Sequence, residues 1–230
     1  MLHILTLATV LLTFNSFAQT PVVSEPIGSY NKGSLLNASD LPPEGPGYMR
    51  LFTKRNRGWG TEEIVSMIVE TAADINQLYP DKDRLQAGDI GAEKGGQISR
   101  HGSHQNGLDI DITYYRVNGK EQKPESINGF QESMVRNGKL SSNFDIVRNW
   151  ELVKTLHKHG KVQRIFLDTV IKRELCKHAR GIGEFTDQVE VLRSLRPFKN
   201  HSDHLHVRLY CPPEAKACKA QEEVAPGPGC

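Results

Sequence analysis

Three segments of the chain repeat apolar residues at the three- and four-residue spacing of an amphipathic helix. The first follows Thr61, a favourable N-cap residue, and its pattern ends near Tyr79. The second follows Asp145, another good N-cap, and reaches Gly160, which has the position of a glycine just beyond a helix end. The third is residues 169–180, TVIKRELCKHAR. We therefore predict a helix in each segment.

Two segments alternate apolar and polar residues with the period of two that is typical of a half-buried strand. In residues 108–114 the even-numbered positions are apolar, and in residues 203–211 the odd-numbered positions from 205 to 209 are apolar. Residues 162–168, VQRIFLD, suit a buried strand, and residues 85–99, LQAGDIGAEKGGQIS, suit a strand that enters a turn. We expect the apolar faces of these strands to meet the core.

The remaining segments have little periodicity. Residues 19–60 are rich in Gly, Pro, Ser and Asn and are predicted to be loops, and residues 117–142 form a polar connection. Residues 187–196 fit a helix or a strand. Because helices and strands do not alternate regularly, we predict an α+β fold, with a small central antiparallel sheet flanked by helices and long loops.

Residues 1–18 have the features of a secretory signal peptide. Residues 4–14 are apolar apart from three threonines, and residues 16–18 provide small side chains at the cleavage positions. The apolar run is shorter than the roughly 20 residues that span a bilayer. We expect cleavage after Ala18, and a mature chain, residues 19–230, that is a single domain without a membrane span.

The four cysteines, all in the last third of the chain, indicate disulfide bonds in an exported protein. Three pairings are possible for four cysteines. Cys211 and Cys218 bracket PPEAKA, a proline-led hexapeptide that can bend back on itself, so we favour this pair. Cys176–Cys230 then follows and would staple the C-terminus. A zinc site of four cysteines is disfavoured because no C-x-x-C pair occurs.

The charge pattern excludes some partners. The formal net charge is +2, and basic and acidic residues are mixed along the chain. This distribution gives no reason to expect binding to nucleic acid or to an acidic membrane surface.

Candidate chemistry lies in the histidines. Five of the nine histidines fall in two tight groups: His101 and His104, then His201, His204 and His206. On the strand predicted for residues 203–211, the side chains of His204 and His206 share the polar face, roughly 6.6 Å apart along the chain. His-x-His on a strand is a recurring arrangement in metal sites.

A turn is needed to join the first histidine group to an acid. On a straight strand His104 and Asp111 would lie about 23 Å apart, too far to share an ion. Asn106-Gly107 between them is a strong turn dipeptide that would fold His104 back toward Asp111. Asp109 shares a face with Asp111, so it either orients a histidine or is merely structural.

Two histidines and one aspartate with an open fourth position favour a hydrolytic zinc site over a structural one. The same set is a signature of mononuclear iron, but an exported disulfide protein is a poor place to keep Fe(II). The alternative without a metal is a polar, exposed sheet face. The motifs G-x-S-x-G and H-E-x-x-H are absent, which disfavours a serine hydrolase and a thermolysin-type protease.

The motifs H-x6-D, from His104 to Asp111, and H-x2-H-x-H, from His201 through His204 to His206, occur in this order. Together they resemble the penicillin-insensitive murein endopeptidases, in the clan of lysostaphin-like and D-Ala-D-Ala carboxypeptidase-like zinc enzymes. The similarity extends to GGQIS, RIFLDTVIK and the C-terminal cysteines, and it covers most of the chain from about residue 30.

The resemblance implies a zinc ion held by His104, Asp111 and His206, with His204 as catalytic base. It places His101 and His201 in the active site as further catalytic histidines, and it implies the disulfides Cys211–Cys218 and Cys176–Cys230. The implied function is a periplasmic endopeptidase that cleaves D-alanyl–meso-diaminopimelyl cross-links of peptidoglycan. A carboxypeptidase or amidase on the same polymer, or a non-catalytic zinc-stabilised wall-binding module, remains the alternative.

Overall fold

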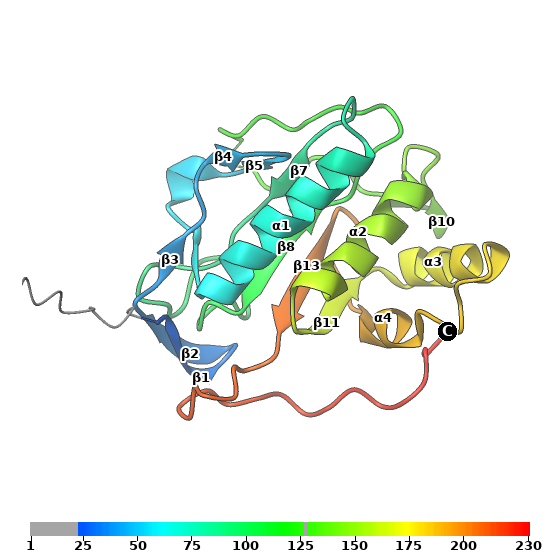
Figure 1. Cartoon of the computed structure of the whole chain (residues 1–230). Coiled ribbons are helices and arrows are strands. Elements are labelled where there is room, and N and C mark those ends of the chain that lie inside the picture. The colour runs from blue at the N-terminus through cyan, green and yellow to red at the C-terminus, as the bar shows by residue number, and fades with distance from the viewer. Residues whose placement is uncertain (1–22, 127) are drawn as a thin grey trace, which may run out of the picture.

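The centre of the fold is a seven-stranded sheet with the strand order β12-β11-β13-β8-β7-β5-β4. A computed structural model of the chain describes residues 23–126 and 128–230, so the predicted signal peptide lies outside the described residues (Figure 1). The strands are β4 Glu44–Gly45, β5 Tyr48–Arg50, β7 Leu85–Ala87, β8 Asp109–Thr113, β11 Val162–Leu167, β12 Leu195–Pro197 and β13 His204–Leu209.

The expectation of a small antiparallel sheet is wrong in size and correct only in part in strand direction, because the β11–β13, β13–β8, β8–β7 and β5–β4 pairs are antiparallel. The sheet has seven strands, and the β11–β12 and β5–β7 pairs are parallel. A parallel pair needs a crossover connection, which helices between the paired strands supply. The extra strands contain two or three residues, too few to show a period of two. The general α+β class is confirmed.

Helices cover one face of the sheet, where α1 and α2 lie side by side (Figure 1). All three predicted helices are confirmed, and the ambiguous residues 187–196 divide between a short helix and β12. Thr61 and Asp145 cap α1 and α2, since their side-chain oxygens accept from the backbone N–H groups of Ile64 and Arg148. The helices are α1 Glu62–Leu78, α2 Ile146–His159, α3 Thr169–Gly181 and α4 Val189–Ser194.

Gly160 ends α2 in a way that differs from the prediction. Its φ of −127° is extended and not left-handed, so it does not form the expected glycine cap. A Cβ at this position would lie 2.3 Å from Sδ of Met67 on α1. Close packing of the end of α2 against α1 therefore favours glycine here, because a larger residue would have to displace the Met67 side chain.

The segments predicted as loops contain short strands. Within the described part of the first segment, residues 23–60, the chain forms two small paired ribbons and a 3-10 turn, and a hairpin lies at residues 135–140 of the second segment. With so many Gly and Pro residues, strands of two to five residues carry no readable periodicity. These elements are β1 Glu25–Ser29, β2 Lys32–Leu36, β3 Ser39–Asp40, η1 Thr53–Arg55, β6 Trp59–Gly60, β9 Val135–Arg136 and β10 Lys139–Leu140.

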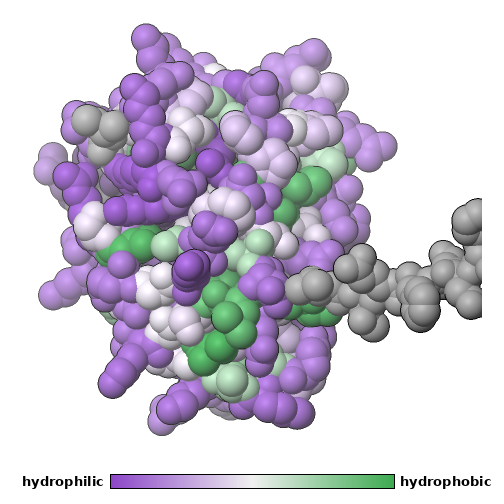
Figure 2. Space-filling view, turned by 90° about the vertical axis from the view of Figure 1, so that its left-hand side faces the viewer, coloured by the Kyte–Doolittle hydropathy of each residue, from purple (hydrophilic) through white to green (hydrophobic). Residues whose placement is uncertain are grey.

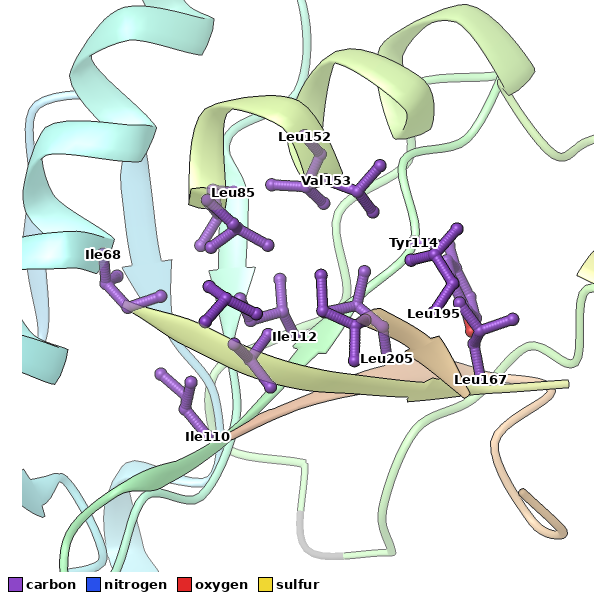
Figure 3. Close-up of a cluster of buried hydrophobic side chains, with 14 of the residues drawn as sticks. Ile68, Leu85, Ile110, Ile112, Tyr114, Leu152, Val153, Leu167, Leu195 and Leu205 are labelled. Atoms are coloured by element: carbon purple, nitrogen blue, oxygen red, sulfur yellow. The ribbon is translucent and has the colours of Figure 1, made fainter. Parts of the chain in front are cut away.

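The core lies between the sheet and the helices α1 and α2 (Figure 3). Ile112 of β8 and Leu205 of β13 point toward Leu152 and Val153 of α2, and Ile110 of β8 lies toward Ile68 of α1, as the alternating pattern predicted. Each of these side chains is buried. Because side chains alternate across a strand, the polar residues of β8 and β13 must lie on the opposite face of the sheet.

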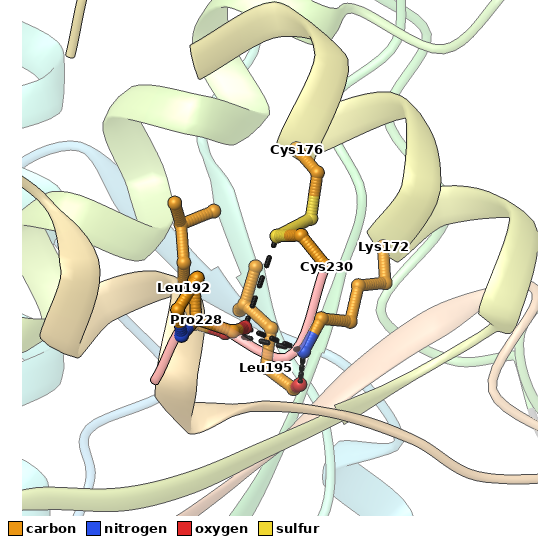
Figure 4. The surroundings of a disulfide bond; sticks show 6 residues. All are labelled: Lys172, Cys176, Leu192, Leu195, Pro228 and Cys230. Atoms are coloured by element: carbon orange, nitrogen blue, oxygen red, sulfur yellow. Dashed lines mark hydrogen bonds between the residues drawn. A yellow bond between two sulfur atoms is a disulfide. The ribbon is translucent and has the colours of Figure 1, made fainter. Parts of the chain in front are cut away.

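Both predicted disulfides, Cys211–Cys218 and Cys176–Cys230, are confirmed. Near Cys230, the ammonium group of Lys172 on α3 donates to three backbone carbonyls, one of them that of Pro228 in the C-terminal tail (Figure 4). The stapled tail is therefore held by hydrogen bonds as well as by the disulfide.

The surface on the side of β1 to β4 is mostly hydrophilic, with apolar side chains in separate patches (Figure 2). Across residues 23–126 and 128–230, no helix has the length and apolar character needed to cross a membrane.

Candidate metal centre

The pairing of β8 with β13 brings the two sequence motifs together. In this antiparallel ladder Asp111 stands opposite His206, and Asp109 stands opposite Arg208. Directly opposed side chains on one face of a sheet lie within about 5.5 Å of each other at Cβ. The strand register therefore sets a carboxylate beside an imidazole on the polar face.

His104 reaches the same place because the chain reverses before β8. His104 and Gly107 both have positive φ, 66° and 76°, and a Cβ on Gly107 would lie 2.6 Å from the Leu35 side chain. The backbone N–H of His104 donates to Oδ2 of Asp109 at 3.0 Å. The ring Nε2 then lies 3.3 Å from Oδ1 of Asp111. The predicted fold-back of His104 over Asp111 is confirmed.

Three ligand atoms in this cluster have the spacing of a tetrahedral metal site. Nδ1 of His206 lies 3.2 Å from Oδ1 of Asp111 and 3.2 Å from Nε2 of His104, and the latter two atoms are 3.3 Å apart. Bonds of about 2.0–2.1 Å place tetrahedral ligand atoms about 3.3–3.4 Å apart. Oδ1 of Asp111 is buried and makes no hydrogen bond. The cluster therefore fits a metal ion.

The outward-facing nitrogens of both ligand rings have fixed neighbours. Nδ1 of His104 lies 2.8 Å from the carbonyl oxygen of Ile90, and Nε2 of His206 lies 3.1 Å from Oδ1 of Asp109. A hydrogen bond of this kind sets the orientation and tautomer of a metal-binding histidine, as the Ile90 carbonyl does for His104. The contact of His206 with Asp109 is a close ionic contact without hydrogen-bond geometry. The sequence did not decide whether Asp109 orients a histidine or is structural. In the structure it contacts the ring of His206 and accepts the backbone N–H of His104.

Asp109 is fully buried and is held by Arg208, whose Nε and NH2 lie 2.7 and 3.0 Å from its two oxygens. Burial would raise the pKa of Asp109, but the charges of His206 and Arg208 outweigh it and hold the pKa well below the usual range. Burial acts in the same way on Asp111, and the charges of His104 and His204 keep its pKa well below the usual range. Both carboxylates are therefore ionised at neutral pH.

His101 approaches Asp111 from the other side. Its Nδ1 lies 3.6 Å from Oδ2 of Asp111, and its Nε2 lies 3.0 Å from Oδ2 of buried Asp89. Ligand atoms of His101, His104 and Asp111 all fall within 4.8 Å of one another, so they form an overlapping second candidate for a metal site. The set with His206 has the shorter and more even spacing, so the geometry favours it.

Asp89 and its two arginines were not found by sequence reasoning. Asp89 accepts from Arg55 at 2.9 Å and lies 3.3 Å from Arg57. Burial would raise its pKa, but the hydrogen bond with His101 and the charge of Arg55 lower it below the ordinary value. The three residues lie outside both motifs and outside any periodic segment, so the sequence offered no signal for them.

His204 stands next to the ligand cluster with its own carboxylate. Its Nδ1 lies 2.6 Å from Asp203, and its Nε2 lies 3.7 Å from Oδ1 of Asp111. The ring of Phe130 stacks on His204 at a centroid distance of 4.4 Å. A carboxylate on one nitrogen and an open side at the other is the arrangement of a general base.

His201 faces His204 with ring centroids 4.9 Å apart. Its Nδ1 lies 2.7 Å from the carbonyl oxygen of Lys199. Burial, together with the nearby charges of His204 and His206, lowers the pKa of His201 to about 4. Its imidazole is therefore neutral at neutral pH in the metal-free protein.

All six predicted site residues line one pocket of about 870 Å³. Its walls include four phenylalanines that no motif had singled out. They are Phe52, Phe130, Phe166 and Phe198. The rest of the lining is largely polar and charged, so the pocket combines a histidine cluster with aromatic and polar walls, a form that suits a polar peptide segment.

The family model for penicillin-insensitive murein endopeptidases matches residues 26–230. The chain belongs to this family. Among relatives that carry the same name, the Haemophilus influenzae protein is 31% identical over 221 residues, covering 91% of this chain and 73% of the relative. The Pectobacterium atrosepticum protein is 32% identical over 223 residues, covering 91% and 74%. The Escherichia coli O157:H7 protein is 30% identical over 217 residues, covering 91% and 75%.

Family membership confirms the resemblance seen in the motifs and makes the chain a peptidase. Both motifs lie inside the matched segment, and the structure brings their histidines and Asp111 into one pocket. The individual roles of these residues remain predictions.

Proposed function

We propose that the protein is a periplasmic zinc-dependent murein endopeptidase that hydrolyses D-alanyl–meso-diaminopimelyl cross-links of peptidoglycan. The observation that carries the proposal is the even spacing of 3.2–3.3 Å among the ligand atoms of His104, Asp111 and His206 at the base of the pocket. The names of the relatives support the substrate, and the two disulfides support an oxidising compartment.

His104, Asp111 and His206 would hold the zinc ion, with two nitrogen ligands and one oxygen ligand. Zinc bound by three protein ligands supplies Lewis acidity toward a carbonyl and lowers the pKa of water to about 7. The same donor set can take iron, but an exported protein with disulfides is a poor place to keep Fe(II), which favours zinc. Asp109 and the Ile90 carbonyl keep the ligand rings in place.

His204 is the general base of this proposal. With Nδ1–H directed to Asp203, its Nε2 carries the free lone pair and faces the pocket. This nitrogen accepts a proton from the attacking water and returns it to the amine that leaves. Stacking on Phe130 fixes the plane of the ring during both steps.

His101 and His201 flank the reacting position. Both rings line the pocket, one next to Asp111 and the other next to His204. From its side His101 hydrogen-bonds the oxygen of the scissile carbonyl as negative charge develops on it. The neutral ring of His201 gives its N–H to the Lys199 carbonyl, so its Nε2 accepts from an N–H or O–H group of the bound peptide. No serine is acylated in this reaction, so a β-lactam has no group with which to react.

The test uses purified disaccharide-peptide dimers, incubated with the mature protein in the presence and absence of a chelator. Monomers with intact stem peptides, formed only without chelator, support the endopeptidase. Loss of the terminal D-alanine from an intact dimer would identify a carboxypeptidase, and release of the peptide from the sugar an amidase. Binding of the dimer without any product would identify a wall-binding module.

A further inference from the structure

Arg100 lies in the wall of the pocket, directly before His101 in the chain. Its φ is 72°, in the left-handed region where a side chain costs free energy that glycine avoids. The side chain is exposed at the pocket surface. A non-glycine residue held in this conformation at a functional site calls for an explanation in terms of what its side chain does.

The backbone on both sides of Arg100 is anchored. The guanidinium group of Arg57 donates to the carbonyl and to the hydroxyl of Ser99, at 3.1 and 2.7 Å. The side-chain amide of Gln97 donates to the carbonyl of His101 at 2.8 Å. Arg100 is therefore presented to the pocket from a fixed turn and not from a loose loop.

The side chain of Arg100 forms no ion pair with an acid among residues 23–126 and 128–230. The carboxylates that line the pocket are already engaged by other groups. Asp89 is bound by His101, Arg55 and Arg57, and Asp111 lies among the histidines. Asp203 is paired with His204. Arg100 thus lines the pocket with an exposed side chain that has no counter-charge from the described residues.

We propose that Arg100 binds a free carboxylate of the substrate, the one that the diaminopimelyl residue carries beside the scissile amide. This inference rests on the proposed function. In that cross-link the nitrogen of the cleaved amide is attached to a carbon that bears a carboxylate. Arg100, His101 and Asp111 line the same pocket, and the ring of His101 lies 3.6 Å from Asp111, so we assign to Arg100 the substrate carboxylate nearest the cleaved bond.

Arginine suits this task better than lysine. Its planar fork binds both oxygens of a carboxylate, whereas an ammonium group acts as a point charge. Lys199 and Lys219 also line the pocket, and they add a general attraction for an acidic peptide without selecting one carboxylate. Arg100 is therefore a specificity-determining residue.

The test compares Arg100→Gly with the parent on three dimers: the free acid, one amidated at this diaminopimelyl carboxylate, and one amidated at the glutamyl carboxylate. Glycine accepts a φ of 72° without strain, so the variant keeps its fold. The parent should prefer the free acid over the diaminopimelyl amide by about tenfold in kcat/KM, and should not discriminate against the glutamyl amide. Arg100→Gly should raise KM for the free acid about tenfold and cleave all three dimers alike.

Arg100→Lys should keep part of the preference, and Arg136→Gln, which changes an exposed arginine of β9, should leave it intact. If the parent cleaves the free acid and the diaminopimelyl amide equally, or if Arg100→Gly still discriminates, the inference is wrong while the endopeptidase activity stands. Discrimination against the glutamyl amide instead would also overturn it. If the parent cleaves no dimer, the proposed function fails and the inference fails with it.

Discussion

The ring of His206 lies between two carboxylates of the neighbouring strand, with Nε2 3.1 Å from Asp109 and Nδ1 3.2 Å from Asp111. Asp111 contacts the nitrogen that faces the ligand cluster, and Asp109 contacts the other one. Arg208 compensates the charge of Asp109 with two close contacts. We therefore propose different tasks for two acids on one strand face: Asp111 to bind the ion, and Asp109 to orient the ring of His206.

Replacement of Asp109 by Asn should weaken zinc binding by about 10- to 100-fold, because the ring of His206 loses its anionic partner. It should also lower the free energy of unfolding of the metal-free protein by about 3 kcal/mol, because Arg208 stays buried without its charge partner. Competition with a chelating dye measures the first effect, and urea denaturation measures the second. The control is Asp81→Asn on the exposed surface. Unchanged zinc affinity in Asp109→Asn would contradict the orienting role.

His204→Ala should keep its zinc and lose most of its turnover, by about 10²- to 10⁴-fold, because only the general base is removed. Its Nε2 is farther from Asp111 than the ring nitrogens of His104 and His206 that face the cluster. Cleavage of muropeptide dimers is followed by chromatography at matched zinc content. Cleavage at close to the parent rate would remove His204 from the mechanism.

The stability of the metal-free protein should decrease as the pH falls from about 6.5 to about 4, in part because of His157. Burial lowers the pKa of this histidine to about 4, and its Nε2 lies 2.7 Å from the Ser194 hydroxyl. Between the two pKa values the unfolded chain binds the proton and the folded chain does not. The contribution of neutral His157 to the free energy of unfolding is therefore complete above pH 6.5 and lost by pH 4.

The parent loses free energy of unfolding between pH 7 and pH 4, and His157→Gln should reduce this loss by up to about 2–3 kcal/mol. Urea denaturation of the parent and the variant at pH 7, 5 and 4 gives the difference, in which the other titrating groups cancel. Identical pH dependence in both proteins would show that His157 takes up its proton equally well in the folded state.

The two disulfides should contribute unequally to stability. Cys176–Cys230 closes a sequence separation of 54 residues and Cys211–Cys218 one of 7. Loop-closure entropy then predicts losses of about 4 and about 2 kcal/mol when each pair is replaced by serine. Denaturation of the two double variants under the same conditions compares them. A larger loss from the short loop would show that native contacts, rather than chain entropy, decide the contribution.

Local patterns in the sequence were sufficient for much of the fold and for the ligand cluster. Thr61 and Asp145 mark helix starts through hydrogen bonds to residues three positions on, and the alternation in β8 and β13 places their polar faces. The Asn106-Gly107 dipeptide was enough to bring His104 back to Asp111 because the chain reversal is itself local.

The features that the sequence did not predict depend on contacts between distant segments. The parallel strands β5 and β12 are three residues long, too short to show a periodic pattern. Only their pairing with β7 and β11 identifies them as strands. Asp89 reaches His101, and Phe130 reaches His204, from segments without a motif. The sequence did not single out Arg100, because only the structure shows its positive φ, its place in the pocket and its lack of an acid partner among the described residues.

The central claim is that His206, and not His101, completes the metal site with His104 and Asp111. Zinc content after dialysis, measured for the parent, His101→Ala and His206→Ala, tests it directly. We predict about one zinc ion per chain in the parent and in His101→Ala, and almost none in His206→Ala. Zinc retained by His206→Ala and lost from His101→Ala would contradict the account and assign the ion to the cluster of His101, His104 and Asp111.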